Sequence, residues 1–273
     1  MSRSLRAELA RLVDARRRGT RLVLLFDYDG TLVPIVEHPS LAALSADTQH
    51  QLEQLALTPS IAIGVLSGRA IDDLRDRVGI EDAYYVGTSG LELSYGSSPI
   101  VEPEPASAAL VAAVAMTLRR ALAGYVGAWL EQKPFGMTVH YRRVCPNQIE
   151  ALQAAVAGAL ASSSSAVRVV RGAMAIEIVP DVGLTKGTAL RMIVEHVGGA
   201  AVLPLYAGDD ANDAEALVAA ADLGGIAIGV GPRAPSPAQY HLSGASSVGS
   251  LVEALLDMLG DSATAEPPSS LKW

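Results

Sequence analysis

The chain of 273 residues has a single cysteine, Cys145. One thiol cannot form an intrachain disulfide, and nothing near Cys145 indicates an activated nucleophile. Lysine is almost as scarce, since Lys133, Lys186 and Lys272 are the only ones. Where arginine serves most cationic positions, a lysine that remains indicates a place for a compact point charge.

Charge and apolar length argue against two classes of partner. The formal net charge is −8 at pH 7, which argues against nucleic acid. The longest apolar runs, such as residues 22–26, are far shorter than a membrane span, and the first residues lack the apolar stretch of a secretory signal. We therefore expect a cytoplasmic monomer with no membrane partner. Half of the residues are hydrophobic and 18% are charged, so a sizeable core can be buried.

Alternating strand-like and helical patterns predict a parallel sheet covered by helices on both faces. Apolar runs typical of buried strands lie at 22–26, 61–66, 83–86, 203–206 and 226–228. Helical periodicity lies at 4–18, 46–57, 70–78, 186–196 and 213–221.

The segment 102–179 breaks this alternation. It begins at a proline-rich stretch, and its pattern is α-β-α-β, with helices at 106–123 and 147–160 and strands at 136–141, 167–170 and 173–178. We predict a small α+β module inserted into a parallel domain made of residues 1–101 and 180–260. Helices on one face of its sheet would leave the other face free to cover something. Residues 261–273 are predicted to be a flexible tail.

Two carboxylates follow the first predicted strand. Asp27 and Asp29 stand at its carboxyl end, where open α/β sheets bind ligands. They would repel each other unless a cation lies between them, and Mg²⁺ takes oxygen ligands and usually keeps a phosphate among them. Gly30 allows a sharp turn, and Thr31 offers a hydroxyl beside the anion. An ordinary Asp-Gly turn is the alternative.

Three later clusters fit the same phosphate site. Ser67-Gly68-Arg69 follows strand 61–66, and its hydroxyl and backbone N–H groups can hold a phosphate oxygen. Lys186 opens a helix and can neutralise phosphate and nucleophile. Asp209 follows another apolar strand as a metal ligand, and Asp213 either ligates through water or holds Lys186. Alone, each cluster could be a helix cap or a surface charge, but three of the four clusters follow directly on apolar strands.

Together the four clusters resemble the haloacid dehalogenase superfamily of phosphohydrolases. The Asp27-Tyr28-Asp29-Gly30-Thr31, Ser67, Lys186 and Gly208-Asp209-Asp210 elements stand in the superfamily's order, over residues 21–259. The resemblance implies an α/β fold with a Rossmann-like parallel sheet, in which the strand of Asp27 lies between the strands that end at Ser67 and Asp209. It also implies that the inserted α+β module is a cap domain.

Further motifs are similar to those of the trehalose-6-phosphate phosphatase family. They include residues 27–35 with Pro39, Leu66-Ser67-Gly68-Arg69, Glu131-Gln132-Lys133, Val139-His140-Tyr141-Arg142, Glu177 before Asp181, and Lys186-Gly187-Thr188. Two positions depart from the family's pattern. Ser89 stands where the family has the histidine of His-Gly-x-Glu, and Asn212-Asp213-Ala214 stands where it has Thr-Asp-Glu.

This resemblance implies a Mg²⁺-dependent phosphatase that hydrolyses trehalose 6-phosphate, a small-molecule sugar phosphate. Asp27 would be the nucleophile and Asp29 the general acid and base, with Lys186 as the third catalytic residue. The implied metal residues are Asp27, Asp29, Asp209, Asp210 and Asp213. The implied phosphate-binding residues are Thr31, Ser67, Gly68 and Lys186. The implied sugar-binding residues are Arg69, Glu92, Lys133, Arg142 and Glu177, although Arg142 beside Arg143 also fits a surface position.

Other functions share this set of residues. A phosphatase of sucrose phosphate, or of a glucosyl- or mannosyl-phosphoglycerate, would have the same core. A phosphomutase would return the phosphoryl group to a sugar, and a required bisphosphate activator would mark it. A non-catalytic sugar-phosphate binder is disfavoured because Asp27, Asp29, Lys186 and Asp209 are all present.

Overall fold

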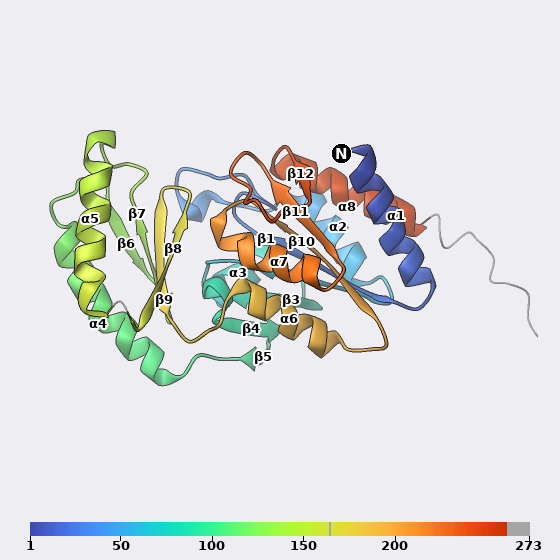
Figure 1. Cartoon of the computed structure of the whole chain (residues 1–273), viewed down its shortest axis with the longest axis horizontal. Coiled ribbons are helices and arrows are strands. Elements are labelled where there is room, and N and C mark those ends of the chain that lie inside the picture. Colours follow the sequence, from blue (N-terminus) through green and yellow to red (C-terminus); the bar gives the residue numbers. More distant parts are fainter. Residues whose placement is uncertain (164, 261–273) are drawn as a thin grey trace, which may run out of the picture.

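The computed structural model describes residues 1–163 and 165–260, and the predicted tail at 261–273 lies outside these residues. The described chain contains two sheets (Figure 1). An eight-stranded sheet has the order β12-β11-β10-β1-β2-β3-β4-β5, and a four-stranded sheet has the order β6-β7-β9-β8. Figure 1 shows the smaller sheet at one end of an elongated molecule, with its strands on the side of the larger sheet and its helices outermost.

The larger sheet is built around β1 (Arg21–Asp27), which pairs in parallel with β2 (Ile61–Leu66) on one side and β10 (Val202–Gly208) on the other. Parallel pairing continues outward to β3 (Ala83–Gly87), β11 (Ile226–Val230) and β12 (Tyr240–Leu242). The predicted central position of the Asp27 strand is therefore confirmed.

Helices cover both faces of this sheet, as the alternating pattern predicted. Leu22, Leu24 and Phe26 of β1 pack in one cluster, whereas Val23 and Leu25 pack in the other, because successive side chains of a strand point to opposite faces. The first cluster includes side chains from α1 (Arg3–Arg17), α2 (Ala46–Ala56), α3 (Ile71–Val78) and α8 (Ala245–Gly260). The second includes side chains from α6 (Lys186–Val197) and α7 (Ala214–Asp222).

Several edge elements were not predicted. The antiparallel hairpin of β4 (Glu92–Tyr95) and β5 (Ser98–Val101) extends one edge of the sheet. These two strands have four residues each and β12 has three, and each contains polar residues that interrupt its apolar run, so no strand pattern was detected. Helix α8 was also missed, although its buried residues recur at helical spacing: Val248, Leu251, Val252, Leu255 and Leu259.

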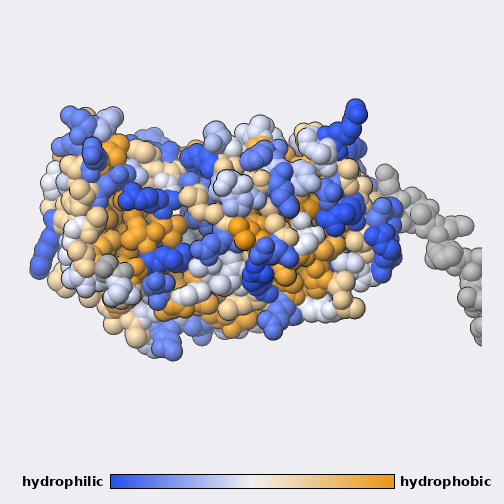
Figure 2. All heavy atoms as spheres, in the orientation of Figure 1, coloured by the Kyte–Doolittle hydropathy of each residue, from blue (hydrophilic) through white to orange (hydrophobic). Residues whose placement is uncertain are grey.

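The smaller sheet, called the cap sheet below, is antiparallel throughout. Its strands are β6 (Trp129–Gln132), β7 (Met137–His140), β9 (Ala175–Pro180) and β8 (Val167–Gly172). Strand β6 was not predicted, so the inserted pattern is α-β-β-α-β-β and not α-β-α-β. Figure 2 shows apolar side chains gathered over the cap strands on this face, interrupted by hydrophilic ones.

Helices α4 (Pro105–Leu122) and α5 (Ile149–Leu160) cover the outer face of the cap sheet. Helix α4 is long and apolar enough, by length and composition alone, to cross a membrane. Its buried side chains share one cluster with Val139 and Ile178 of the cap sheet and with Leu152 of α5. One face of helix α4 therefore packs against the cap sheet and α5.

Candidate active site

The four predicted motif clusters converge at the carboxyl edge of the larger sheet. Asp27 pairs in register with Leu66, directly before Ser67, and Phe26 pairs with Ala207, two residues before Asp209. Lys186 begins helix α6, and its Nζ donates a hydrogen bond to Asp27 at the end of β1. The sheet register thus brings together residues that are far apart in the sequence.

Lys186 is the centre of a buried ionic network. Its Nζ donates to Asp27 Oδ1 at 2.6 Å and to Asp213 Oδ1 at 2.7 Å, and its side chain is 1% exposed. Burial acts to lower the pKa of Lys186, but the charges of Asp213 and Asp27 outweigh burial and raise it. A charged lysine therefore holds the Asp27 carboxylate in one orientation.

Both oxygens of Asp213 are already used. Oδ1 accepts from Lys186 and from the Tyr206 hydroxyl at 2.6 Å, and Oδ2 accepts from the backbone N–H groups of Asp209 at 2.9 Å and Asp210 at 3.1 Å. Of the two sequence-based alternatives for Asp213, the structure shows the one in which it holds Lys186. Asp213 also fixes the turn that presents Asp209.

The residues around Asp27 fit a hard divalent cation. One oxygen from each of Asp27, Asp209 and Asp213 lies within 4.8 Å of the others. Burial raises the pKa of Asp27 well above its ordinary value, and Lys186 only partly opposes it. Burial, reinforced by the charge of Asp213, raises the pKa of Asp209 to about 7. The negative charge of these carboxylates is therefore not fully compensated by nearby cations. Carboxylate oxygens are also the ligands that Mg²⁺ prefers.

Gly30 and Thr31, which follow Asp29 in the chain, lie close to this group of carboxylates. Gly30 has a φ of +99°, and a Cβ built on it would overlap the Asp209 carboxylate. Thr31 is fully buried, and its hydroxyl oxygen has no hydrogen-bond partner within the described chain. A buried polar atom without a partner is costly, so the Thr31 hydroxyl fits a ligand at this position.

Arg233 was missed by the sequence analysis. Its Nη2 pairs with Asp209 Oδ2, and its Nε lies 3.4 Å from Asp210 Oδ2. Asp210 also accepts from the Ala211 N–H at 2.8 Å. The available signal was that Arg233 follows β11, another parallel strand whose carboxyl end lies at this edge.

Arg69 contacts Asp29 directly, although sugar binding was predicted for it. Its Nε and Nη2 donate to the two carboxylate oxygens of Asp29 at 2.6 and 2.8 Å. Its Nη1 donates to Asp73 at 2.8 Å, and Nη2 also donates to the Pro39 carbonyl at 2.9 Å. In this structure Arg69 holds Asp29, and both side chains line the cavity described next.

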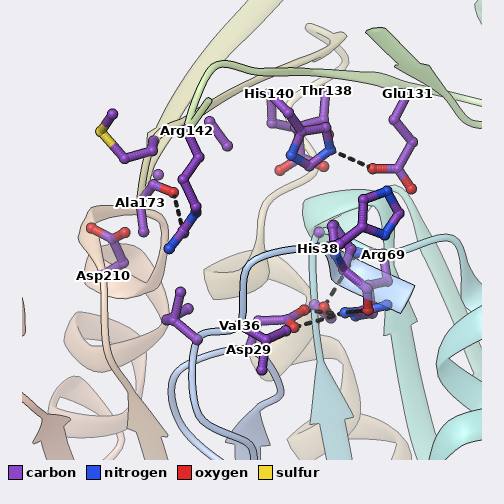
Figure 3. Close-up of a pocket in the computed structure, with 18 of the residues that line it drawn as sticks. Asp29, Val36, His38, Arg69, Glu131, Thr138, His140, Arg142, Ala173 and Asp210 are labelled. Atoms are coloured by element: carbon purple, nitrogen blue, oxygen red, sulfur yellow. Dashed lines mark hydrogen bonds and ion pairs between the residues drawn. The ribbon is translucent and has the colours of Figure 1, made fainter. Parts of the chain in front are cut away.

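A cavity separates the edge of the larger sheet from the cap sheet. Figure 3 shows Glu131, His140 and Arg142 on the cap side, opposite Asp29 and Arg69. Alternate cap residues line the cavity: Trp129, Glu131, Lys133, Thr138, His140, Ala175 and Glu177. The residues between them include Met137, Val139, Ile176 and Ile178, which pack in the core with α4 and α5. The cap sheet thus presents a hydrogen-bonding face to the catalytic edge.

Lys133 and Glu177 lie together on this face and touch the larger domain. Lys133 Nζ donates to Thr138 Oγ1 at 2.8 Å and lies 3.4 Å from Glu177 Oε1. It also donates to the Gly68 carbonyl at 2.5 Å. A Cβ on Gly68 would approach Glu177 Oε2 to 2.9 Å. Two predicted sugar-binding residues therefore meet the predicted phosphate loop.

Ser89, one of the two departures from the family pattern, donates its hydroxyl to Glu177 Oε2. Glu92 accepts from Thr88 Oγ1 at 2.5 Å, and it is not among the residues that line the cavity within the described chain. Burial raises the pKa of Glu92. The structure thus places Glu92 behind the site, where it supports the loop that carries Ser89.

Arg142 lines the cavity and is exposed, so the surface position is confirmed, whereas sugar binding stays a prediction. Its Nη2 donates to the Ala173 carbonyl at 3.0 Å. Three stacked rings, to which the sequence analysis gave no role, also line the cavity. His38 and Trp129 stack with centroids 5.2 Å apart, and Trp129 and His140 stack at 4.1 Å. The indole of Trp129 therefore joins the loop after β1 to the cap.

The fold is that of the haloacid dehalogenase superfamily. It is similar to a phosphatase of that superfamily from Bacteroides thetaiotaomicron, with a TM-score of 0.59, 19% identity, and coverage of 88% of this chain and 95% of that chain. It is also similar to the C-terminal domain of trehalose-6-phosphate phosphatase from C. albicans, with a TM-score of 0.78, 24% identity, and coverage of 92% and 96%.

The model of the trehalose-phosphatase family matches residues 25–242, and the chain belongs to this family. The trehalose-phosphate phosphatase of Mycobacterium tuberculosis is 37% identical over 198 residues, which are 71% of this chain and 50% of that protein. The relative from Mycobacterium bovis matches equally well. The chain spans about half the length of the curated relatives it matches.

Proposed function

We propose that this protein is a Mg²⁺-dependent phosphatase that hydrolyses trehalose 6-phosphate through an aspartyl phosphate on Asp27. Residues 1–101 and 180–260 would form the catalytic core, and residues 102–179 the cap. We expect the protein to act as a cytoplasmic monomer on this small-molecule substrate. Membership of the trehalose-phosphatase family supports the activity.

One observation carries the proposal. The Asp27 carboxylate lies at a cavity floor next to Asp209, and Lys186 holds it. The opposite wall is a sheet face with hydrogen-bonding side chains, including Lys133 and Glu177. A site with charged groups at its floor, and with side chains that can hydrogen-bond sugar hydroxyls on the opposite wall, suits a phosphorylated sugar.

The phosphoryl transfer would take two steps. An oxygen of Asp27 attacks phosphorus, and the bond from phosphorus to the sugar oxygen breaks while Asp29 gives that oxygen a proton. Water then attacks phosphorus, passes a proton to Asp29, and releases phosphate and Asp27. Lys186 offsets the charge of the nucleophile as the phosphate approaches. In this structure both oxygens of Asp29 accept from Arg69, so Asp29 would have to leave this ion pair, take up a proton from water and turn towards the leaving oxygen before the first step.

The remaining phosphate contacts would come from Thr31, Ser67 and the Gly68 backbone. Asp27, Asp209 and the backbone carbonyl of Asp29 would hold Mg²⁺, which when bound supplies positive charge against the phosphate oxygens. Asp210 lines the cavity beside this group. Asp213 would act through Lys186 and Asp209, because its own oxygens are occupied by four donors.

Sugar binding would fall to Lys133, Glu177 and Arg142. Lys133 and Glu177 are nearly buried and both line the cavity. Lys133 Nζ already makes three contacts, to Gly68, Thr138 and Glu177, so a sugar hydroxyl would have to replace one of them. Arg142 lies at a more exposed part of the same wall. Glu92 would not contact the sugar, and would act only by supporting the loop of Thr88 and Ser89.

The proposal is tested by phosphate release from a panel of sugar phosphates, with MgCl₂ and with a chelator. Trehalose 6-phosphate should be hydrolysed best, only with the metal, and not at all by Asp27→Asn. Faster release from sucrose phosphate or a phosphoglycerate glycoside would overturn the substrate assignment. A required bisphosphate activator would identify a phosphomutase instead.

A further inference from the structure

Arg233 is placed where it neutralises the predicted metal ligand. Its guanidinium pairs with Asp209 Oδ2 and lies 3.4 Å from Asp210 Oδ2. Asp209 is almost fully buried, whereas the Arg233 side chain is 41% exposed and reaches in from solvent. The buried carboxylate is fixed, and the arginine is the partner that is free to move.

The charges near this edge do not balance. Four carboxylates, those of Asp27, Asp209, Asp210 and Asp213, face two cations, Lys186 and Arg233. Lys186 is fully engaged with Asp27 and Asp213. Within the described residues, Arg233 is therefore the only side-chain cation paired with Asp209.

A guanidinium and Mg²⁺ cannot share Asp209 without cost. Like charges a few ångströms apart in a partly buried site repel each other strongly. Mg²⁺ also requires oxygen ligands at about 2.0–2.1 Å in nearly octahedral geometry, which leaves little room for a guanidinium beside the same carboxylate. An exposed arginine can rotate into water, where its charge is solvated, at little cost.

We infer that Arg233 is the counter-ion of Asp209 in the metal-free protein and that Mg²⁺ binding displaces it. This inference rests on the Mg²⁺ site of the proposed function. Arg233 then has two opposite effects: it stabilises the acidic cluster without metal and weakens metal binding. It is a positioning residue that sets metal affinity, and it takes no part in the phosphoryl transfer.

The test compares Arg233→Ala with the wild type by titration calorimetry with MgCl₂ after chelator treatment, without substrate. Removing the competing pair should tighten Mg²⁺ binding by up to about fivefold. The melting temperature of Arg233→Ala should be lower than wild type without metal and equal to it at saturating MgCl₂. Arg233→Gln, which keeps a polar side chain but removes the charge, should behave in the same way.

Two controls separate the possible causes. Arg233→Lys keeps the charge and should bind Mg²⁺ about as the wild type does. Arg191→Ala removes an arginine of similar exposure, 46%, that pairs with the exposed Asp222, and it should leave Mg²⁺ affinity unchanged.

The outcomes are distinct for the inference and for the proposed function. If the wild type binds Mg²⁺ and the two variants Arg233→Ala and Arg233→Gln bind it equally well or more weakly, the role of Arg233 is overturned. The proposed function is not affected by that result. A wild type that neither binds Mg²⁺ nor gains thermal stability from it overturns the proposed metal requirement, and the inference with it.

Discussion

The guanidinium of Arg69 binds both carboxylate oxygens of Asp29, with Nε and Nη2 at 2.6 and 2.8 Å. Asp29 is the proposed general acid, and this paired contact sets the position from which it turns towards the leaving group. The fork of an arginine holds a carboxylate in one plane, which the point charge of a lysine cannot do.

Arg69→Lys should therefore lower kcat for trehalose 6-phosphate by about ten- to a hundredfold, which is less than the roughly 10²–10⁴-fold of a full general-acid contribution because Asp29 itself is kept. An activated aryl phosphate needs little acid help and should lose less. Arg77→Lys is the matched control, because Arg77 binds Asp73 and the Ala42 carbonyl but not Asp29. Equal losses in the two variants, or on the two substrates, would contradict this role of Arg69.

Lys186→Met should destabilise the fold as well as remove activity. It leaves Asp27 and Asp213 buried without their counter-ion, and losing one partner of a buried ion pair costs about 3–5 kcal/mol. The double variant Lys186→Met/Asp213→Asn should regain part of this free energy without regaining turnover. Urea unfolding and phosphate release measure the two effects. A double variant less stable than Lys186→Met would show that unpaired charge is not the cause.

Glu177→Gln should separate sugar recognition from phosphate chemistry. It removes a charged acceptor that faces Ser89 and Lys133, worth about 1.5–3 kcal/mol, so kcat/KM for trehalose 6-phosphate should fall about ten- to a hundredfold. A small aryl phosphate does not reach the cap face and should be hydrolysed almost as before. Glu150→Gln, an exposed substitution on cap helix α5, should change neither value. Matched losses on both substrates would assign Glu177 to the fold instead.

Gly30→Ala should disrupt the metal site. Its Cβ would overlap the Asp209 carboxylate, and the φ of +99° adds backbone strain. We expect Mg²⁺ binding by calorimetry to be lost or greatly weakened. Gly19→Ala is a matched control, because Gly19 has a φ of +96° with nothing within 4 Å of the added Cβ. Metal binding should be unchanged in Gly19→Ala; a loss shared by both variants would point to strain alone.

The sequence by itself predicted the central part of the fold. The apolar runs before Asp27, Ser67 and Asp209 are long enough to identify as strands, and parallel strands present their carboxyl ends at one edge. The local sequence pattern was therefore enough to predict that these residues lie close together. It failed for β4, β5, β6 and β12, because these short strands contain polar residues that interrupt the apolar run, whereas the equally short run at 226–228 is entirely apolar.

The partners of individual charges were decided only by the tertiary structure. Arg69 was expected at the sugar but lies on Asp29, 40 residues away, and Arg233 reaches Asp209 from a loop without a motif. Glu92 was expected at the cavity but supports the loop behind it. The physical reason is that an ion pair depends on distance in space and on burial. Periodicity reports neither, since it describes only which face of an element a side chain occupies.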